Sequence, residues 1–319
     1  MHQASGRSLF GFSLALTTAV LWGMLPIALK IVLTSLTANT ITWVRFLVAA
    51  LFITAVLYRQ NALPSFRFAS HTIRKLMAIA VVGLLLNYIL YLMGLDRLSA
   101  ETAQVVIQLA PFLMMLGGVI IFRERLLLWQ KIGALLLVVG LLLFFNSRLV
   151  TLLSQFGNDS LGVLLVIIAA ITWAAYALAQ KQLLLHYSSQ QIMWFIYLAG
   201  AISFLPLSDV APIAELTALH WAMLGFCCVN TIVAYGAFAE ALEHWEASKV
   251  SAVLAITPLL TILFANLVHW LWPSTPTPEQ LNHWSLLGAC LVVLGSAVTA
   301  LSPLLKKHLA ARKAQTVGS

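Results

Sequence analysis

The chain has few charged residues. Only 9% of its 319 residues are charged, whereas an ordinary soluble domain has roughly a quarter, so polar groups are too scarce to cover a soluble particle of this size. Three cysteines exclude a disulfide scaffold, and 17 glycines exclude a collagen-like fibre. The hydrophobic content of 61% excludes intrinsic disorder as well. These absences leave a polytopic membrane protein.

Catalytic and cofactor-binding motifs are also missing. The sequence contains no P-loop, nucleophile elbow or dinucleotide fingerprint, and its histidines and cysteines lack metal-ligand spacing. All ten acidic residues fall in loops or at the ends of apolar segments, so we expect no carboxylate at the bilayer centre. We therefore expect no enzyme, no metal and no cofactor. The net charge of +8 is better explained by membrane topology than by nucleic-acid binding.

The chain is instead rich in apolar segments. A transmembrane helix needs about 20 mostly apolar residues. Ten segments meet this requirement: 9–29, 40–58, 75–93, 101–122, 130–146, 161–181, 191–207, 219–239, 249–271 and 284–302. The first lacks a convincing signal-peptide cleavage site, so we interpret it as a retained span. The fold class expected is all-α, with ten transmembrane helices and no extramembranous domain.

The basic residues predict the orientation of these spans. If the ten segments alternate in direction, most of the 18 Lys and Arg fall on one side, and Lys30, Arg97 and Arg148 fall on the other. Basic loops resist translocation, so both termini are expected in the cytoplasm, including a basic tail at 306–319. Arg45 lies just inside the second span, near the outer face, where we expect it to pair with Glu101 or Asp96.

The two halves of the chain repeat one another. Three matched stretches carry the repeat: Gly11-x10-Trp22-x7-Lys30 with Gly162-x10-Trp173-x7-Lys181, Leu95 to Pro111 with Leu242 to Pro258, and Gly133-x6-Gly140 with Gly288-x6-Gly295. This predicts two five-helix units, at 1–150 and 151–305. Because five is odd, the second unit enters the membrane from the opposite side. Inverted repeats of this kind are typical of secondary transporters, which open a shared site to each side in turn.

The repeated stretches also resemble a known family. The runs QLAPFL, FRERL and GALLLVVG lie between Gln108 and Gly140, and AITPLL and LGACLVVLG are their partners in the second half. With the two Trp helices, they resemble the EamA family of the drug/metabolite transporter superfamily over residues 9–302. The resemblance implies an inner-membrane exporter of amino acids, related metabolites or drugs. It also implies a cavity lined by the first, third, fourth, sixth, eighth and ninth helices. A flippase for a lipid-linked or amphipathic solute is the alternative.

Polar and aromatic side chains within the spans are the candidates for binding a small-molecule substrate. They are Trp22, Asn87, Tyr91, Gln108, Trp173, Tyr176, Asn230 and Tyr235. Asn87 and Asn230 occupy matching positions, and each offers a donor and an acceptor. An interhelical hydrogen bond explains both equally well. The aromatic residues can stack on a substrate or serve as packing and interfacial anchors.

Three further residues are candidates for gating. Pro111 and Pro258 each remove a backbone hydrogen bond near mid-span, which predicts two hinges, with inert kinks as the alternative. Glu240 is the only plausible carboxylate gate, although a hydrated helix end beside Lys249 is the favoured explanation. The paired glycines predict that the fifth and tenth helices pack closely as a brace outside the transport path. The expected partners are the substrate and the bilayer, with the chain a monomer or a homodimer.

Overall fold

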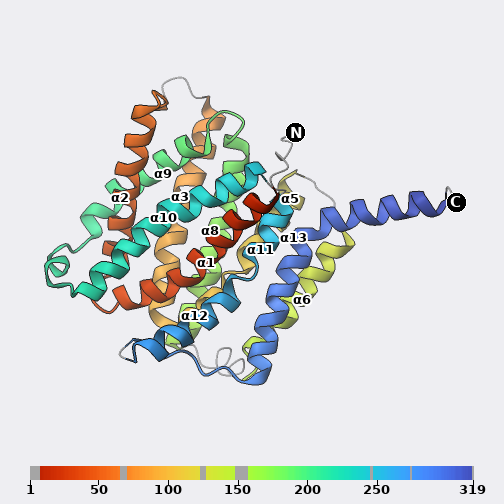
Figure 1. Ribbon diagram of the computed structural model, residues 1–319. Coiled ribbons are helices and arrows are strands. Elements are labelled where there is room, and N and C mark those ends of the chain that lie inside the picture. The colour runs from red at the N-terminus through yellow and green to blue at the C-terminus, as the bar shows by residue number, and fades with distance from the viewer. Residues whose placement is uncertain are drawn as a thin grey trace.

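The computed structural model describes residues 8–64, 70–122, 127–147, 157–244, 247–273 and 275–317. Within these ranges every regular element is a helix (Figure 1). The first half contains α1 (Ser8–Val32), α2 (Ala38–Arg59), α3 (His71–Arg97), α4 (Ala100–Val106), α5 (Leu109–Phe122) and α6 (Leu128–Phe144). The second contains α8 (Asn158–Leu183), α9 (Ser189–Phe204), α10 (Ala218–His244), α11 (Ala247–Leu254), α12 (Thr257–Leu271) and α13 (His283–Val317), with two short 3₁₀ helices, Leu205–Leu207 and Ala211–Glu215.

Hydroxyl side chains fix where several helices begin. Thr37, Ser70 and Ser99 precede α2, α3 and α4, and each side chain accepts a hydrogen bond from a backbone N–H in the first turn. Ser188 does the same for α9 and forms a reciprocal capping box with Gln191. These bonds satisfy N–H groups that have no partner within the helix.

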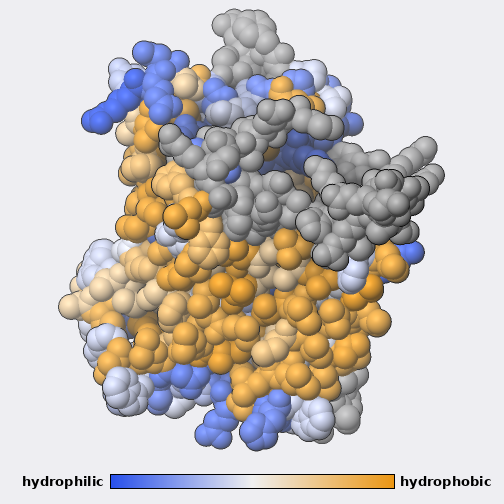
Figure 2. Space-filling model, turned by 45° about the vertical axis from the view of Figure 1, so that its right-hand side comes forward, coloured by the Kyte–Doolittle hydropathy of each residue, from blue (hydrophilic) through white to orange (hydrophobic). Residues whose placement is uncertain are grey.

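Most of the helices can cross a bilayer. Among the described residues, eight are long and apolar enough to do so: Leu9–Val32, Ala38–Arg59, His71–Arg97, Asn158–Leu183, Ser189–Leu207, Ala218–Phe238, Ala252–Leu271 and His283–Ser302. Helix α6 is a shorter apolar helix of 17 residues. Figure 2 shows a broad hydrophobic band with hydrophilic surface above and below it. The chain is an all-helical membrane protein, and the count of ten spans stays a prediction.

Two of the predicted spans are broken rather than continuous. The segment expected at 101–122 is divided into α4 and α5, and the segment expected at 249–271 is divided into α11 and α12. In each case the second helix has its proline in the first turn, Pro111 in α5 and Pro258 in α12. A proline is tolerated there because the first N–H groups of a helix have no intrahelical acceptor. The backbone therefore breaks before each proline and not at it.

The helices associate in pairs that join the two halves of the chain. The most extensive contacts are α6 with α13, α3 with α8, and α1 with α10 (Figure 1). The α6–α13 pair is held by its glycines. A Cβ atom at Gly140 would lie 2.7 Å from the carbonyl oxygen of Gly288, and one at Gly295 would lie 2.5 Å from that of Gly133. The predicted close packing of the fifth and tenth helices is confirmed.

Candidate functional site

A cavity of about 630 Å³ lies between the two halves of the chain. Its size falls within the range of small-molecule binding sites. All six helices expected to line it contribute residues, and so do α2, α6 and α13. The expectation that α6 and α13 stand outside the path is therefore wrong, because Gln130, Ser296 and Thr299 line the cavity. Leu137, which lies between Gly133 and Gly140, lines the cavity as well, so the helix pair held by the glycines also forms part of the cavity wall.

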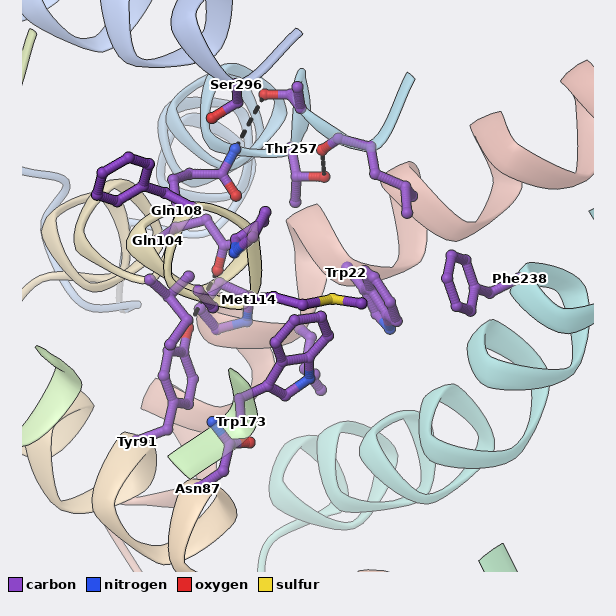
Figure 3. Close-up of a pocket in the computed structure, with 18 of the residues that line it drawn as sticks. Trp22, Asn87, Tyr91, Gln104, Gln108, Met114, Trp173, Phe238, Thr257 and Ser296 are labelled. Carbon is purple, nitrogen blue, oxygen red and sulfur yellow. Dashed lines mark hydrogen bonds between the residues drawn. The ribbon is translucent and has the colours of Figure 1, made fainter. Parts of the chain in front are cut away.

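All but one of the predicted substrate-binding residues border this cavity. They are Trp22, Asn87, Tyr91, Gln108, Trp173, Asn230 and Tyr235. The first five of these are labelled in Figure 3. Tyr176 is not among the lining residues. It is buried in a hydrophobic cluster between α2, α3 and α9, where its hydroxyl lies 3.5 Å from the sulfur of Met193. Its spacing from Trp173 places both on one side of α8, but neighbouring helices cover Tyr176.

Aromatic rings form much of the cavity wall. Trp22 meets Tyr235 edge to face at 5.5 Å between ring centroids, and Phe238 lies 5.8 Å from the same indole. Trp173, the counterpart of Trp22 in the second half, lines the cavity from α8 (Figure 3). These faces can stack on a flat or branched apolar group.

The two matched asparagines hold helices together. Asn87 on α3 donates from Nδ2 to the carbonyl oxygen of Ala169 on α8, at 2.9 Å. Asn230 on α10 donates from Nδ2 to the carbonyl oxygen of Leu21 on α1, at 2.6 Å. Both residues also line the cavity, so each can join two helices and still contact a ligand in the cavity. The Oδ1 atom of Asn230 is buried and has no hydrogen-bond partner among the described residues.

Two glutamines lie where the first broken span is interrupted. Gln104 on α4 accepts a hydrogen bond from the hydroxyl of Tyr91, at 3.1 Å. Gln108 lies between α4 and α5 and donates from Nε2 to the carbonyl oxygen of Ala255, at 3.3 Å (Figure 3). Ala255 lies between α11 and α12, so this bond joins the two breaks. The backbone carbonyl of Ala255, at the break between α11 and α12, thus accepts a hydrogen bond from a side chain at the break between α4 and α5. Backbone groups inside a membrane need such partners because lipid offers none.

The sequence is similar to a known family of transporters over most of its length. The model of the EamA-like transporter family matches residues 9–146 and again 160–301. The chain belongs to the EamA-like transporter family. It is 42% identical to an uncharacterized transporter of Haemophilus influenzae over 95% of this chain and 98% of that one. The inner membrane transporter YhbE of Escherichia coli K12 is 40% identical, covering 94% of this chain and 93% of YhbE.

Two weaker similarities also cover nearly the whole length of both chains. A probable amino-acid metabolite efflux pump of Escherichia coli K12 is 23% identical to this transporter, covering 96% of this chain and 98% of the pump. A crystal structure with 18% sequence identity superposes with a TM-score of 0.61, covering 96% of this chain and 99% of that one. The resemblance to EamA proteins is confirmed, and the chain is a membrane transporter.

The three predicted gating residues of this EamA-like transporter lie in different surroundings. Pro111 borders the cavity, whereas Pro258 is buried in the first turn of α12 and does not. Glu240 lies in the last turns of α10, and its side chain falls outside the part of the chain that the structure describes. Among the described residues, no group of three or more His, Cys, Asp or Glu side chains is placed to hold a metal ion.

Arg45 lies in the cavity wall, where the sequence did not place it. It does not pair with Glu101 or Asp96. Its Nε donates to the hydroxyl of Thr231 on α10 at 3.0 Å, and its guanidinium carbon lies 4.7 Å from the centre of the Tyr88 ring. The residue is only 3% exposed and borders the cavity. A basic residue inside an apolar span was the one available signal of a functional position.

The cavity is sealed at one end. Its lining stops at Leu29 on α1 and Leu92 on α3, which are fully buried, and reaches Lys181 and Ala300 at the other end. Beyond Leu29, the Nζ of Lys30 donates to the carbonyl oxygens of Leu95 and Asp96, at 2.8 and 2.9 Å. We call this sealed side the closed end.

A loop from the second half covers the closed end. The carboxylate of Glu279, between α12 and α13, accepts hydrogen bonds from the hydroxyls of Ser99 and Thr102 at the start of α4. The backbone N–H of Glu279 donates to Oε1 of Glu101, at 3.3 Å. We call these contacts of Glu279 the latch. They fasten the second half of the chain to the first on the side away from the open part of the cavity.

Proposed function

We propose that this protein is a secondary active transporter that exports small organic solutes across the bacterial inner membrane. It works by alternating access between two inverted five-helix units, at 1–150 and 151–305. The single observation that carries the proposal is the cavity itself, which both halves line and whose lining runs from the buried Leu29 and Leu92 at one end to the exposed Lys181 at the other. A transporter that rocks between two states needs such a half-open site between its repeats.

Pairing between the halves supports the inverted arrangement. Helices α1 and α8 are equivalent in the repeat, and so are α3 and α10, so the contacts of α3 with α8 and of α1 with α10 are equivalent pairs. Each pair is bridged by a matched asparagine, Asn87 in one and Asn230 in the other. Gln108 bonds to Ala255, which is its own counterpart in the second repeat. Such a self-equivalent contact is expected on a pseudo-two-fold axis.

The interrupted helices supply the moving parts. Pro111 and Pro258 follow the breaks at matching positions, and we propose that the two breaks are hinges. With both termini in the cytoplasm, the closed end faces the periplasm and the cavity faces the cytoplasm. That is the loading state of an exporter. The inner-membrane location follows the name of YhbE, and the solute class follows that of the efflux pump. The working unit is a monomer or a homodimer in the bilayer.

The decisive experiment measures transport in inverted membrane vesicles from an overexpressing strain. Radiolabelled amino acids and related metabolites are offered with and without a proton gradient. We expect at least one solute to accumulate in vesicles with this protein, and a double Trp22→Ala, Trp173→Ala variant of equal abundance to lose that accumulation. Vesicles that accumulate no offered solute beyond the double-variant background would contradict the proposal.

A further inference from the structure

The charge of the cavity points to the chemistry of its ligand. Among the described residues that border the cavity, the charged side chains are Arg45 and Lys181, and none is acidic. The remaining polar groups of the lining are amides and hydroxyls, which are neutral. A cation or the ammonium group of a zwitterion therefore meets no carboxylate in this part of the wall.

Arg45 is the more deeply placed of the two cations. Across the described residues, no carboxylate oxygen lies within ion-pair distance of its guanidinium, and its hydrogen bonding to protein is the one from Nε to Thr231. The whole residue is only 3% exposed, yet its two Nη atoms are not among the side-chain atoms that are both fully buried and without a hydrogen-bond partner. Because they have no partner among the described residues, both Nη atoms must keep some accessible surface. The Nη groups thus keep their access to the cavity that Arg45 borders.

A buried charge without a counter-ion is costly, and within membrane spans such groups usually serve a function. An arginine adds geometry to its charge, because the planar guanidinium can donate two parallel hydrogen bonds to a carboxylate. Here the fork is held in place by the Tyr88 ring on one side and by Thr231 through Nε. These contacts leave the two Nη groups as the donors available to a ligand.

We propose that Arg45 binds the carboxylate of the transported solute, and that the solutes are organic anions with a flat or branched apolar body. The body would lie against Trp22 and Trp173, the aromatic faces of the same cavity. The inference rests on the proposed transport function and narrows its substrate class. A zwitterionic amino acid would bind less well than the matching acid, because its ammonium group would be desolvated with no acidic partner among the described lining residues.

The test uses four ligands with one aromatic ring and different head groups. Phenylacetate, phenylacetamide, phenethylamine and phenylalanine are titrated into the purified full-length protein in detergent, and binding is followed by calorimetry. We expect phenylacetate to bind at least tenfold more tightly than each of the others. Equal or tighter binding of the amide, the amine or the amino acid, or no measurable binding of phenylacetate, would overturn the assignment. Because no transport step is involved, vesicles that fail to transport would count against the proposed function only.

Variants of Arg45 locate the anion contact. We expect Arg45→Gln to reduce the affinity for phenylacetate to that for phenylacetamide, and Arg45→Lys to restore part of the difference because it returns the charge without the fork. Arg59→Gln, which removes an exposed arginine from the far end of the same helix, is the matched control and keeps the wild-type preference. A carboxylate preference that persists in Arg45→Gln would assign the contact elsewhere. If Arg45→Gln fails to fold, the wild-type head-group series and Arg45→Lys still decide the question.

Discussion

At the scale of single residues, polar side chains in this protein have two tasks at once. Asn230 is 1% exposed, bonds to the backbone of α1, and still borders the cavity. Arg45 likewise joins α2 to α10 while its Nη groups stay accessible. In a membrane, polar groups of one helix are satisfied by the next, so the residues that can meet a solute also hold the walls together.

Asn230→Leu tests this double role. We expect export to be abolished and membrane insertion to be unchanged, as measured by vesicle transport and by the amount of protein in the membrane. The lost interhelical bond should also lower stability by about 0.6–2 kcal/mol, read from thermal unfolding in detergent. Asn266→Leu is the control, because Asn266 is exposed and its amide bonds only within α12. Unchanged export by Asn230→Leu would remove this residue from the site.

Most of the substrate-binding residues predicted from the sequence border the cavity, but the sequence did not predict their contacts. Trp22 and Trp173 were found through the repeat, because a matched pair of large aromatics stands out at a constant offset. Tyr176 was misplaced, since helical spacing gives the side of α8 but not the helices that cover it. The partners of Arg45, Tyr88 and Thr231, lie 43 and 186 residues away on other helices, and no local pattern encodes such a meeting.

At the scale of helices, apolar length predicted where elements lie, and packing decided how they end. The expected spans fall on helices, two of them interrupted, because backbone groups within the hydrocarbon must be satisfied inside the protein. The prolines signalled a disturbance near mid-span but not its form. A proline marks the start of the following helix, and in the interruption between Val106 and Leu109 the side chain of Gln108 donates to the carbonyl oxygen of Ala255. That contact arises only when the two halves associate.

The α6–α13 pair provides a sharp test of helix packing. A Cβ atom at Gly288 would lie 2.3 Å from the backbone nitrogen of Phe144, which cannot move without shifting α6. We expect Gly288→Ala to destabilise the protein by about 1–3 kcal/mol, measured as a lower thermal midpoint in detergent. In Gly236→Ala the new Cβ would meet nothing within 4 Å, so its midpoint should stay at or slightly above that of wild type. Equal midpoints for the two variants would show that the close approach is not needed.

At the scale of the whole molecule, the orientation of the closed end decides which way a solute moves. The basic loops predict both termini in the cytoplasm. A C-terminal fusion to a reporter active only outside the cytoplasm should therefore give no signal, while a fusion to a reporter active only in the cytoplasm should. The opposite result would place the open end of the cavity on the periplasmic side. The structure would then be the outward-facing state of the transporter.

Alternating access also requires the closed end to open, and the latch is what must then break. Ala265 lies with Lys30 and Glu101 around a small cavity of about 40 Å³ at this end. In a Cys290→Ser background, which removes the exposed cysteine, Ala265→Cys reports whether an impermeant maleimide reaches that cavity from outside the cell. The other two cysteines are buried and stay in place.

Adding Glu279→Ala removes the carboxylate that holds Ser99 and Thr102. Hydrogen bonds to a charged group contribute about 1.5–3 kcal/mol, so the open population and the labelling rate should rise about tenfold or more. Glu215→Ala is the control, because this exposed acid lies in a 3₁₀ helix outside the latch and should leave the rate unchanged. Equal rates for the two variants would mean that the Glu279 contacts only order a loop, and that the barrier between the two states lies in the cavity floor at Leu29 and Leu92.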